Sequence, residues 1–351
     1  MSASELLAVV AGVAAASWIL ISVVRTVVLP RPERVWLTML SFDVARRMSL
    51  ALARRFPSAK SHRILGVFAP TVLVSLPLVW SLGLIAAFAS IYWGADVGTL
   101  RESIELSGSS LTTLGIADTP RFPISLIVII QALVGLSILA LMIGFLPTLY
   151  GTFSSREVAV GRLTTRAGSP PVPASFVARL HEIGRLAHIS ELWEDWEDWF
   201  VELGETHTTF PALIFFRSSR HEQHWLAAAE TALDTAALVD AARLIPTQGH
   251  AATMIRSGYL AIRAVADFYH IAPELTPDLH DQLSIDRSDF DRLLNDLEGR
   301  GIELQRNRDD IWIDFAGWRI NYDKSHTCLA DLIGFVPSHW DHIAPPVEET
   351  S

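Results

Sequence analysis

The sequence predicts a mainly α-helical membrane protein whose second half is a soluble helical domain. Three runs without a charged residue, at residues 6–24, 64–95 and 122–155, are each long enough to cross a bilayer as a helix. Charge divides the chain in a similar way. Residues 1–170 carry 14 Lys and Arg against 8 Asp and Glu, whereas residues 171–351 carry 14 against 30. Such asymmetry predicts two modules in different surroundings.

Composition excludes several classes of function. An acidic second half disfavours nucleic acid as a partner, because phosphates need a basic surface. The single cysteine, Cys328, can form neither an internal disulfide nor a thiolate metal site. Phosphate-binding loops, dinucleotide-binding glycine motifs and nucleophile elbows are absent from the sequence. We therefore expect no enzyme and no cofactor.

The first predicted segment, residues 1–63, combines a membrane helix with a basic stretch. The run at 6–24 resembles a signal peptide in length, but it lacks a basic start, and Glu5 is its only early charge. We therefore expect a retained helix. Residues 30–63 hold eight basic against two acidic residues, which places them in the cytoplasm. Apolar residues at helical spacing over 35–52 indicate either an amphipathic helix on the membrane or a linker helix packed on protein.

The other two uncharged runs complete a consistent topology for a multi-pass protein of the cell membrane. Residues 64–95 exceed the length of a simple span, which tilt or bends at Pro70 and Pro77 would absorb. Residues 122–155 hold Gln131 as their one strong polar group, and Arg156 follows them. The positive-inside rule then places residues 96–121 outside and everything after about 156 in the cytoplasm.

A short polar segment lies between these two runs. Thr99 and Glu102 form a capping box, which predicts a short helix over 99–111. The chain then reads Thr-Thr-Leu-Gly-Ile-Ala-Asp over residues 112–118. Irregular backbone at membrane depth is tolerated only within protein or beside water. The sequence thus predicts a membrane pore module over 64–155, built as helix, re-entrant pore loop and helix, with an extra N-terminal transmembrane helix.

This module resembles the pore of the potassium-channel family, whose filter reads roughly Thr-Val-Gly-Tyr-Gly-Asp, usually after another Thr. The resemblance covers under a third of the chain. It implies that carbonyls and hydroxyls of the loop replace the water of a K⁺ ion or another monovalent cation. The implied selectivity filter comprises Thr112, Thr113, Leu114, Gly115, Ile116, Ala117 and Asp118. Ile116 and Ala117 stand where the family has Tyr and Gly, so a cation pore is supported better than strict potassium selectivity.

One loop per chain predicts a homotetramer, because four loops are needed to close such a pore. Three acidic residues, Asp96, Glu102 and Glu105, are expected in the outer vestibule, where they would concentrate cations. Gly135 lies 20 residues after Gly115. The resemblance implies a gating hinge there, and a close-packing glycine in a membrane helix explains it equally well.

A Pro-rich linker over 156–175 predicts the boundary to an acidic cytosolic helical domain, residues 176–344, and a disordered tail, 345–351. Helical patterns cover 176–186, 191–203, 225–244, 251–269 and 288–297, and 311–322 indicates a small hairpin. This domain would assemble or gate the pore and could bind an unknown ligand. The alternative function is a membrane-anchored enzyme or sensor whose loop does not conduct.

The candidate metal sites in the second half are weak. The acidic residues beside Trp193, Trp196 and Trp199 could sense a divalent cation, but acids next to aromatic residues more often form a solvated helix face. The pairs His181 with His188, His221 with His224 and Glu205 with His207 match no metal motif. The partners expected from the membrane helices and the single pore loop are membrane lipid and further copies of the chain.

Overall fold

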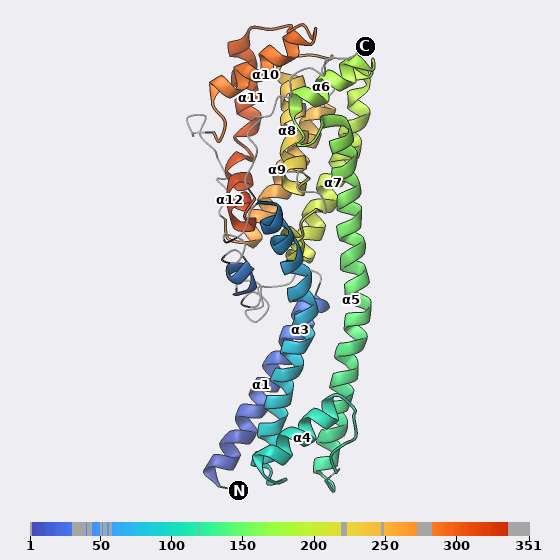
Figure 1. Ribbon diagram of the computed structural model, residues 1–351, viewed down its shortest axis with the longest axis vertical. Helices are drawn as coiled ribbons and strands as arrows, with labels where there is room; N and C mark the ends of the chain where they lie inside the picture. The colour runs from blue at the N-terminus through green and yellow to red at the C-terminus, as the bar shows by residue number, and fades with distance from the viewer. Residues whose placement is uncertain are drawn as a thin grey trace. The chain divides into compact units, whose positions relative to one another are not determined.

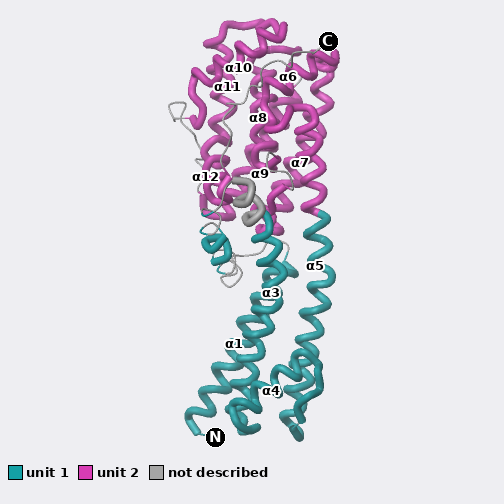
Figure 2. Tube along the Cα trace, in the orientation of Figure 1, with its two compact units in different colours: residues 1–151 teal, residues 152–351 magenta. Residues whose placement is uncertain are grey.

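The computed structural model describes residues 2–29, 58–118, 120–218, 223–246, 249–271 and 283–335, with a few positions between 40 and 55. Their regular elements are all helices, which confirms the mainly α-helical class. The chain forms two compact units, residues 1–151 and 152–351 (Figure 2). The basic stretch predicted at 30–63 lies largely outside the described residues, and the predicted tail at 345–351 lies wholly outside them.

Within the described residues, three helices are long and apolar enough to span a membrane; all three begin in unit 1, and the last continues into unit 2 (Figure 1). They are α1 (Ala3–Val27), α3 (Ser58–Gly94) and α5 (Ile124–Ala167), and the short α4 (Leu100–Leu111) precedes α5. All four were predicted, and each long helix extends beyond its uncharged run because the flanking residues continue the backbone hydrogen bonding. These helices indicate a membrane protein.

Helix α1 lies antiparallel against α3 through close glycine contacts. A Cβ atom on Gly12 would come within 2.6 Å of the Ala87 carbonyl oxygen, and one on Gly94 within 2.5 Å of the Glu5 carbonyl oxygen. The two backbones can approach this closely because glycine lacks a side chain. Helix α1 is therefore an integral part of unit 1.

The end of α5 differs from the expected linker. The helix continues past residue 155 to Ala167 and passes from unit 1 into unit 2 without interruption. The first half of the predicted 156–175 linker is thus helical, because Val160, Leu163 and Ala167 are buried in unit 2. The chain turns only at Gly168, whose φ of +88° suits glycine.

Unit 2 is built around α8 (Trp225–Ala241), which is buried on almost every side. Its neighbours are α6 (Pro173–Glu182), α9 (His250–Phe268), α11 (Arg308–Arg319) and α12 (Asp323–Ile333). Helix α7 (Ile189–Thr209) packs along α9 and buries Trp193, Trp196, Trp199 and Phe200. These aromatic side chains are core residues of unit 2.

The hairpin predicted at 311–322 is wrong, because most of this segment is helix α11. Asn307 begins the helix by accepting a hydrogen bond from the Asp309 amide at 2.9 Å. Ile311 and Phe315, four residues apart, are fully buried on one face. Aromatic packing of Phe315 on Phe290 of α10 (Arg287–Gly299) outweighs the β-propensity on which the prediction relied. Gly317 lies inside the helix rather than in a turn.

Arg156 fixes the end of α5 within unit 2. Its guanidinium is buried and donates hydrogen bonds to the carbonyl oxygens of Leu213 at 2.9 Å and Phe216 at 2.7 Å. It also lies 3.3 Å from Nε2 of His207. The pKa of His207 lies well below its usual value, because burial and then Arg156 disfavour the charged ring.

We expect Arg156→Met to destabilise unit 2 by about 3–5 kcal/mol, because it strands two buried carbonyl oxygens and the carboxylate of Glu157. Arg162 is exposed on the same helix, so Arg162→Met serves as the control and should change stability by about 0.5 kcal/mol or less. Denaturant titration of tryptophan fluorescence measures both variants. Equal stability of the two would show that the Arg156 contacts do not hold α5 in unit 2.

Candidate functional site

Helix α4 and the loop that follows it form the candidate site in unit 1. Thr99 and Glu102 cap the start of α4 as predicted: the Thr99 side chain accepts from the Glu102 amide, and the Glu102 carboxylate accepts from the Thr99 amide at 2.7 Å. Small polar side chains then follow along the buried side of the helix, at Ser103, Ser107, Ser109 and Ser110. These serines place α4 against its neighbours and shape the loop.

A buried hydrogen-bond network ties α4 to α3 and α5. The side-chain amide of Gln131 on α5 donates to the hydroxyl of Ser107 at 2.7 Å and accepts from the hydroxyl of Tyr92 at 2.8 Å. Ser107 donates in turn to the Ile85 carbonyl of α3 at 2.9 Å. Polar groups away from water need such partners, so these bonds specify one position for α4. Ser110 adds a bond to the Val128 carbonyl of α5 at 2.7 Å.

The loop at 112–118 folds back onto the last turns of α4 through its backbone amides. The amide of Thr113 donates to the Ser110 carbonyl at 3.1 Å, and that of Leu114 donates to the Ser109 carbonyl at 3.0 Å. The Ser109 hydroxyl then accepts from the amides of Ile116 at 2.9 Å and Ala117 at 3.3 Å. One serine side chain thus closes the second half of the loop.

These amide bonds fix the direction of the loop carbonyls. In a planar trans peptide, the C=O of one residue and the N–H of the next point in opposite directions. Four amides of the loop point at the end of α4, so four carbonyl groups point away from it. They belong to Thr112, Thr113, Gly115 and Ile116. The arrangement leaves four carbonyl acceptors directed away from the end of α4, whose C-terminus is itself partially negative.

Two residues in the loop have left-handed backbone angles, with φ of +55° at Thr113 and +69° at Gly115. A Cβ on Gly115 would meet no atom within 4 Å, so glycine is favoured here by conformation and not by space. A β-branched threonine at positive φ is strained by about 1–3 kcal/mol. Such strain is concentrated at functional sites, and the surrounding hydrogen bonds hold it in place.

The structure brings the seven predicted filter residues together in one surface loop. In a single chain Leu114 is 66% exposed and Ile116 is 75% exposed, and the other members are exposed apart from the half-buried Ala117. Such exposure of large apolar residues marks a surface that meets protein or lipid. The oligomer that would cover this surface stays a prediction.

The predicted outer-vestibule acids have local partners. Glu102 caps its own helix through Thr99, and Glu105 forms an ion pair with Arg101 at 2.9 Å. Asp96 follows the end of α3, at a positive φ of 57°.

Gly135 on α5 lies against Leu111, the last residue of α4. A Cβ at this position would come within 2.0 Å of the Leu111 carbonyl oxygen, so glycine is required for the contact between α4 and α5. The structure thus supplies the close-packing explanation that the sequence left open. The hinge function stays a prediction, and Gly135→Ala cannot test it alone because the substitution also displaces α4.

Other candidate sites gain no support within the described residues. Groups of three or more His, Cys, Asp or Glu side chains that could hold a metal ion do not occur there. His207 contacts Arg156 rather than Glu205, and His221 lies outside the described residues. A scan of protein-family models, a search of curated proteins and a search of solved structures each find no match to this chain.

The residues that hold α4 and the loop in place could not be identified from the sequence. Ser109, Ser107 and Tyr92 carry no motif, and their partners are distant in the chain. Gln131 offered a signal, because a strong polar group inside an uncharged membrane-length run needs a partner. Its partner, the end of α4, could be identified only from the packing.

We expect Ser109→Ala to impair the loop more than the fold, because it removes the acceptor for two loop amides and leaves α4 otherwise intact. An unpartnered amide costs about 1–3 kcal/mol when it is shielded from water. If the loop forms the filter predicted from the sequence, ion flux into liposomes should lose most of its potassium-over-sodium preference. Ser109→Thr keeps the hydroxyl and should preserve that preference. If both variants behave like the native chain, Ser109 does not position the loop.

Proposed function

We propose that four copies of the chain form a pore that conducts monovalent cations, with potassium favoured, along the loop at 112–118. The observation that carries this proposal is that four amides of the loop bond to the end of α4, so that the preceding carbonyls, of Thr112, Thr113, Gly115 and Ile116, point away from it. A cation that leaves water must be met by several oxygen atoms at once. One strand of carbonyls supplies a quarter of such a cage, and cyclic symmetry supplies the rest.

The uncovered surface of unit 1 supports assembly. In a single chain, only 17% of the most apolar 18-residue stretch of α5 is buried, whereas 44% of the corresponding stretch of α3 is buried. Several large apolar side chains of α5 are more than half exposed in a single chain, including Ile129, Leu133, Leu136, Leu139 and Ile143. In the proposed tetramer one side of α5 would meet the neighbouring copies, and the remainder would meet lipid.

The proposed orientation follows from unit 1 and the charges. The end of α3 at Gly94 lies against the start of α1 at Glu5, so both belong on the same side of the membrane as α4. The basic stretch at 30–63 then lies on the opposite, cytoplasmic side, together with Arg162 and Arg166. Unit 2 would thus be cytoplasmic, and the continuous helix α5 would connect it to the pore, which it would assemble or gate.

Reconstitution into liposomes tests the proposed function. We expect the native chain to carry potassium flux that exceeds sodium flux and to exclude a large organic cation such as N-methyl-D-glucamine. Native mass spectrometry of the same sample should give the mass of four chains. A monomer without flux would contradict the pore and favour the alternative, in which unit 2 carries the function of a membrane-anchored enzyme or sensor.

A further inference from the structure

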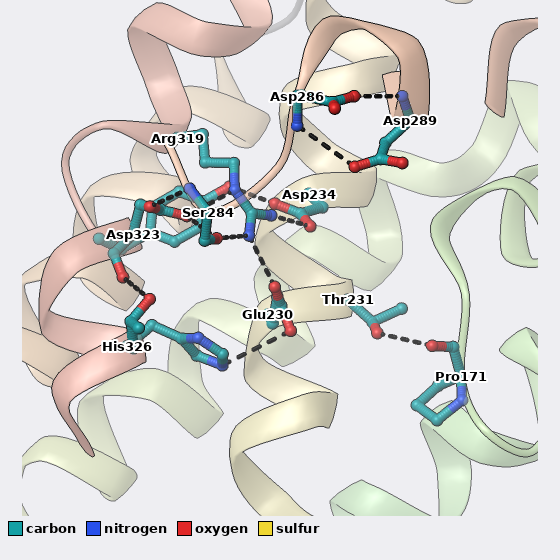
Figure 3. Close-up of polar contacts among 12 residues, drawn as sticks. Pro171, Glu230, Thr231, Asp234, Ser284, Asp286, Asp289, Arg319, Asp323 and His326 are labelled. Carbon is teal, nitrogen blue, oxygen red and sulfur yellow. Dashed lines mark hydrogen bonds and ion pairs between the residues drawn. The ribbon is translucent and has the colours of Figure 1, made fainter. Parts of the chain in front are cut away.

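A buried ionic cluster joins α8, α11 and α12 in unit 2, and Figure 3 shows its side chains converging on Arg319. We call it the Arg319 cluster, and its members are Glu230, Asp234, Ser284, Arg319, Tyr322, Asp323 and His326. Its ionisable groups are all at most 9% exposed. The cluster is remote in sequence from the loop, and neither the predicted pore nor any predicted metal site makes use of it.

Arg319 is saturated with acceptors. Its Nε donates to Asp323 at 2.8 Å, and its two terminal nitrogens donate to Asp234 at 2.5 Å and to Glu230 at 2.7 Å. The Ser284 hydroxyl also lies 3.0 Å from Nη2. Asp323 is further stabilised as a carboxylate by the Ser284 amide, at 2.8 Å. One guanidinium thus serves three carboxylates.

The charges of the described members of this cluster do not balance. Among these residues, three carboxylates and one guanidinium give a net charge of −2 when all are ionised and His326 is neutral. Carrying an unbalanced charge into a protein core costs several kcal/mol per ion, and such sites usually take up a proton instead. The second observation is the His326 ring. Its Nε2 is buried without a hydrogen-bond partner and lies 3.6 Å from Glu230.

We propose that the Arg319 cluster is a proton-binding site, in which Asp234 on α8 holds one proton at mildly acidic pH and releases it as the pH rises through neutrality. Asp234 is fully buried, whereas Asp323 has an additional amide donor that favours its ionised form. Charged and titratable groups face the site from each element of the cluster. They are Glu230 from α8, Arg319 from α11, and Tyr322, Asp323 and His326 at and within α12.

The electrostatics of the groups agree with this assignment. Burial raises the pKa of Asp234 to about 7 from its ordinary value of 3.8, although Arg319 opposes the rise. Burial also lowers the pKa of His326, which disfavours the charged form of its ring. The Tyr322 hydroxyl donates to Asp234 at 2.6 Å, and the pKa of Tyr322 lies well above its usual value, chiefly because of burial.

The sign of the pH effect follows from this shift. Between about pH 4 and pH 7 the folded chain binds a proton at Asp234 that the unfolded chain has released. The contribution of Asp234 to stability is therefore present at low pH and is lost as the pH rises to about 7. This dependence belongs to unit 2 and holds whether or not the pore conducts.

Thermal unfolding of the full chain in detergent at pH 5 and pH 8 tests the site. Asp234→Asn imitates the protonated acid, so we expect its melting temperature to exceed that of the native chain by more at pH 8 than at pH 5. Any pH dependence of stability that comes from His207 is the same in the native and Asp234→Asn chains, so it does not affect the difference between their melting temperatures. Asp198 is exposed on α7, and Asp198→Asn serves as the matched control with no pH-dependent difference. A constant difference between the native and Asp234→Asn chains at the two pH values would overturn the proposal.

Infrared spectroscopy gives a readout that does not depend on the stability of a variant. The native chain should show the C=O band of a protonated carboxyl group at pH 6 and lose it by pH 8.5. Tyr322→Phe removes a hydrogen bond to the ionised form of Asp234, so the midpoint of this loss should move to higher pH. No band in the native chain, or a midpoint that moves with Asp198→Asn and not with Tyr322→Phe, would contradict the site. If His326→Gln abolished the pH-dependent loss of this band and Asp234→Asn did not, the assignment of the proton to Asp234 would be overturned.

Discussion

Replacing Gly115 with valine should abolish selective cation flux while the protein stays folded and assembled. The φ of Gly115 is +69°, a conformation that a β-branched residue adopts only at a cost of about 1–3 kcal/mol. That cost corresponds to a roughly 5- to 140-fold drop in the correctly shaped loop in every subunit. A Cβ on Gly115 would meet no atom within 4 Å, so packing elsewhere should be unaffected.

Gly108 provides the matched control for this variant. It lies in α4, one turn before the loop, and a Cβ there would also meet no atom within 4 Å. Its φ is not left-handed, so Gly108→Ala should retain selective flux and stabilise α4 by up to about 1 kcal/mol. Liposome flux and native mass, measured side by side, separate loss of function from loss of assembly. Equal selectivity of Gly115→Val and Gly108→Ala would show that the loop conformation does not govern conduction.

Gly135→Ala should destabilise unit 1 and abolish flux. The new Cβ would come within 2.0 Å of the Leu111 carbonyl oxygen, which is backbone and cannot rotate away. Either α4 or α5 must therefore move, at a cost of about 1–3 kcal/mol or more, and the Gln131 network would be strained with them. A lower melting temperature together with loss of flux is the expected result.

Gly144→Ala is the control for Gly135→Ala on the same helix. A Cβ on Gly144 would meet no atom within 4 Å, so this variant should keep the melting temperature and the flux of the native chain. The comparison also separates packing from gating at Gly135. A hinge without a packing role would leave the melting temperature of Gly135→Ala unchanged and alter only the open probability in single-channel recordings. That outcome would remove the contact with Leu111 as the main reason for glycine at this position.

Local patterns in the sequence predicted most elements of this fold. Uncharged runs located α1, α3 and α5, and the Thr99–Glu102 capping box located α4, because these signals depend on neighbouring residues. The hairpin prediction for residues 311–322 failed because aromatic and β-branched residues favour a strand locally, whereas packing against Phe290 holds Phe315 in a helix. Helix α12 was missed, since half of its buried face is polar, at Asp323, Ser325 and His326, and gives no apolar pattern.

The candidate site was only partly predictable. Gly115 could be proposed from the loop sequence, because a left-handed turn favours glycine at a recognisable place. The direction of the carbonyls depends on the Ser109 hydroxyl, which lies seven residues before Ile116 and has no signature of its own. The Arg319 cluster was invisible for the same reason, since Arg319 is 85 residues from Asp234 in the chain. Polar groups that meet only through tertiary packing leave no periodic pattern.

A substituted-cysteine block of the current tests the central claim most directly. Cys328 is the single cysteine, so Cys328→Ser gives a background without thiols. Leu114→Cys would then carry a lone thiol in the proposed filter, and Leu100→Cys would carry one at the exposed start of α4 as the control. A positively charged thiosulfonate reagent should block the current of the Leu114→Cys chain and leave that of the Leu100→Cys chain unchanged. Complete labelling of Leu114→Cys, verified by mass, with an undiminished current would contradict the claim that this loop lines the pore.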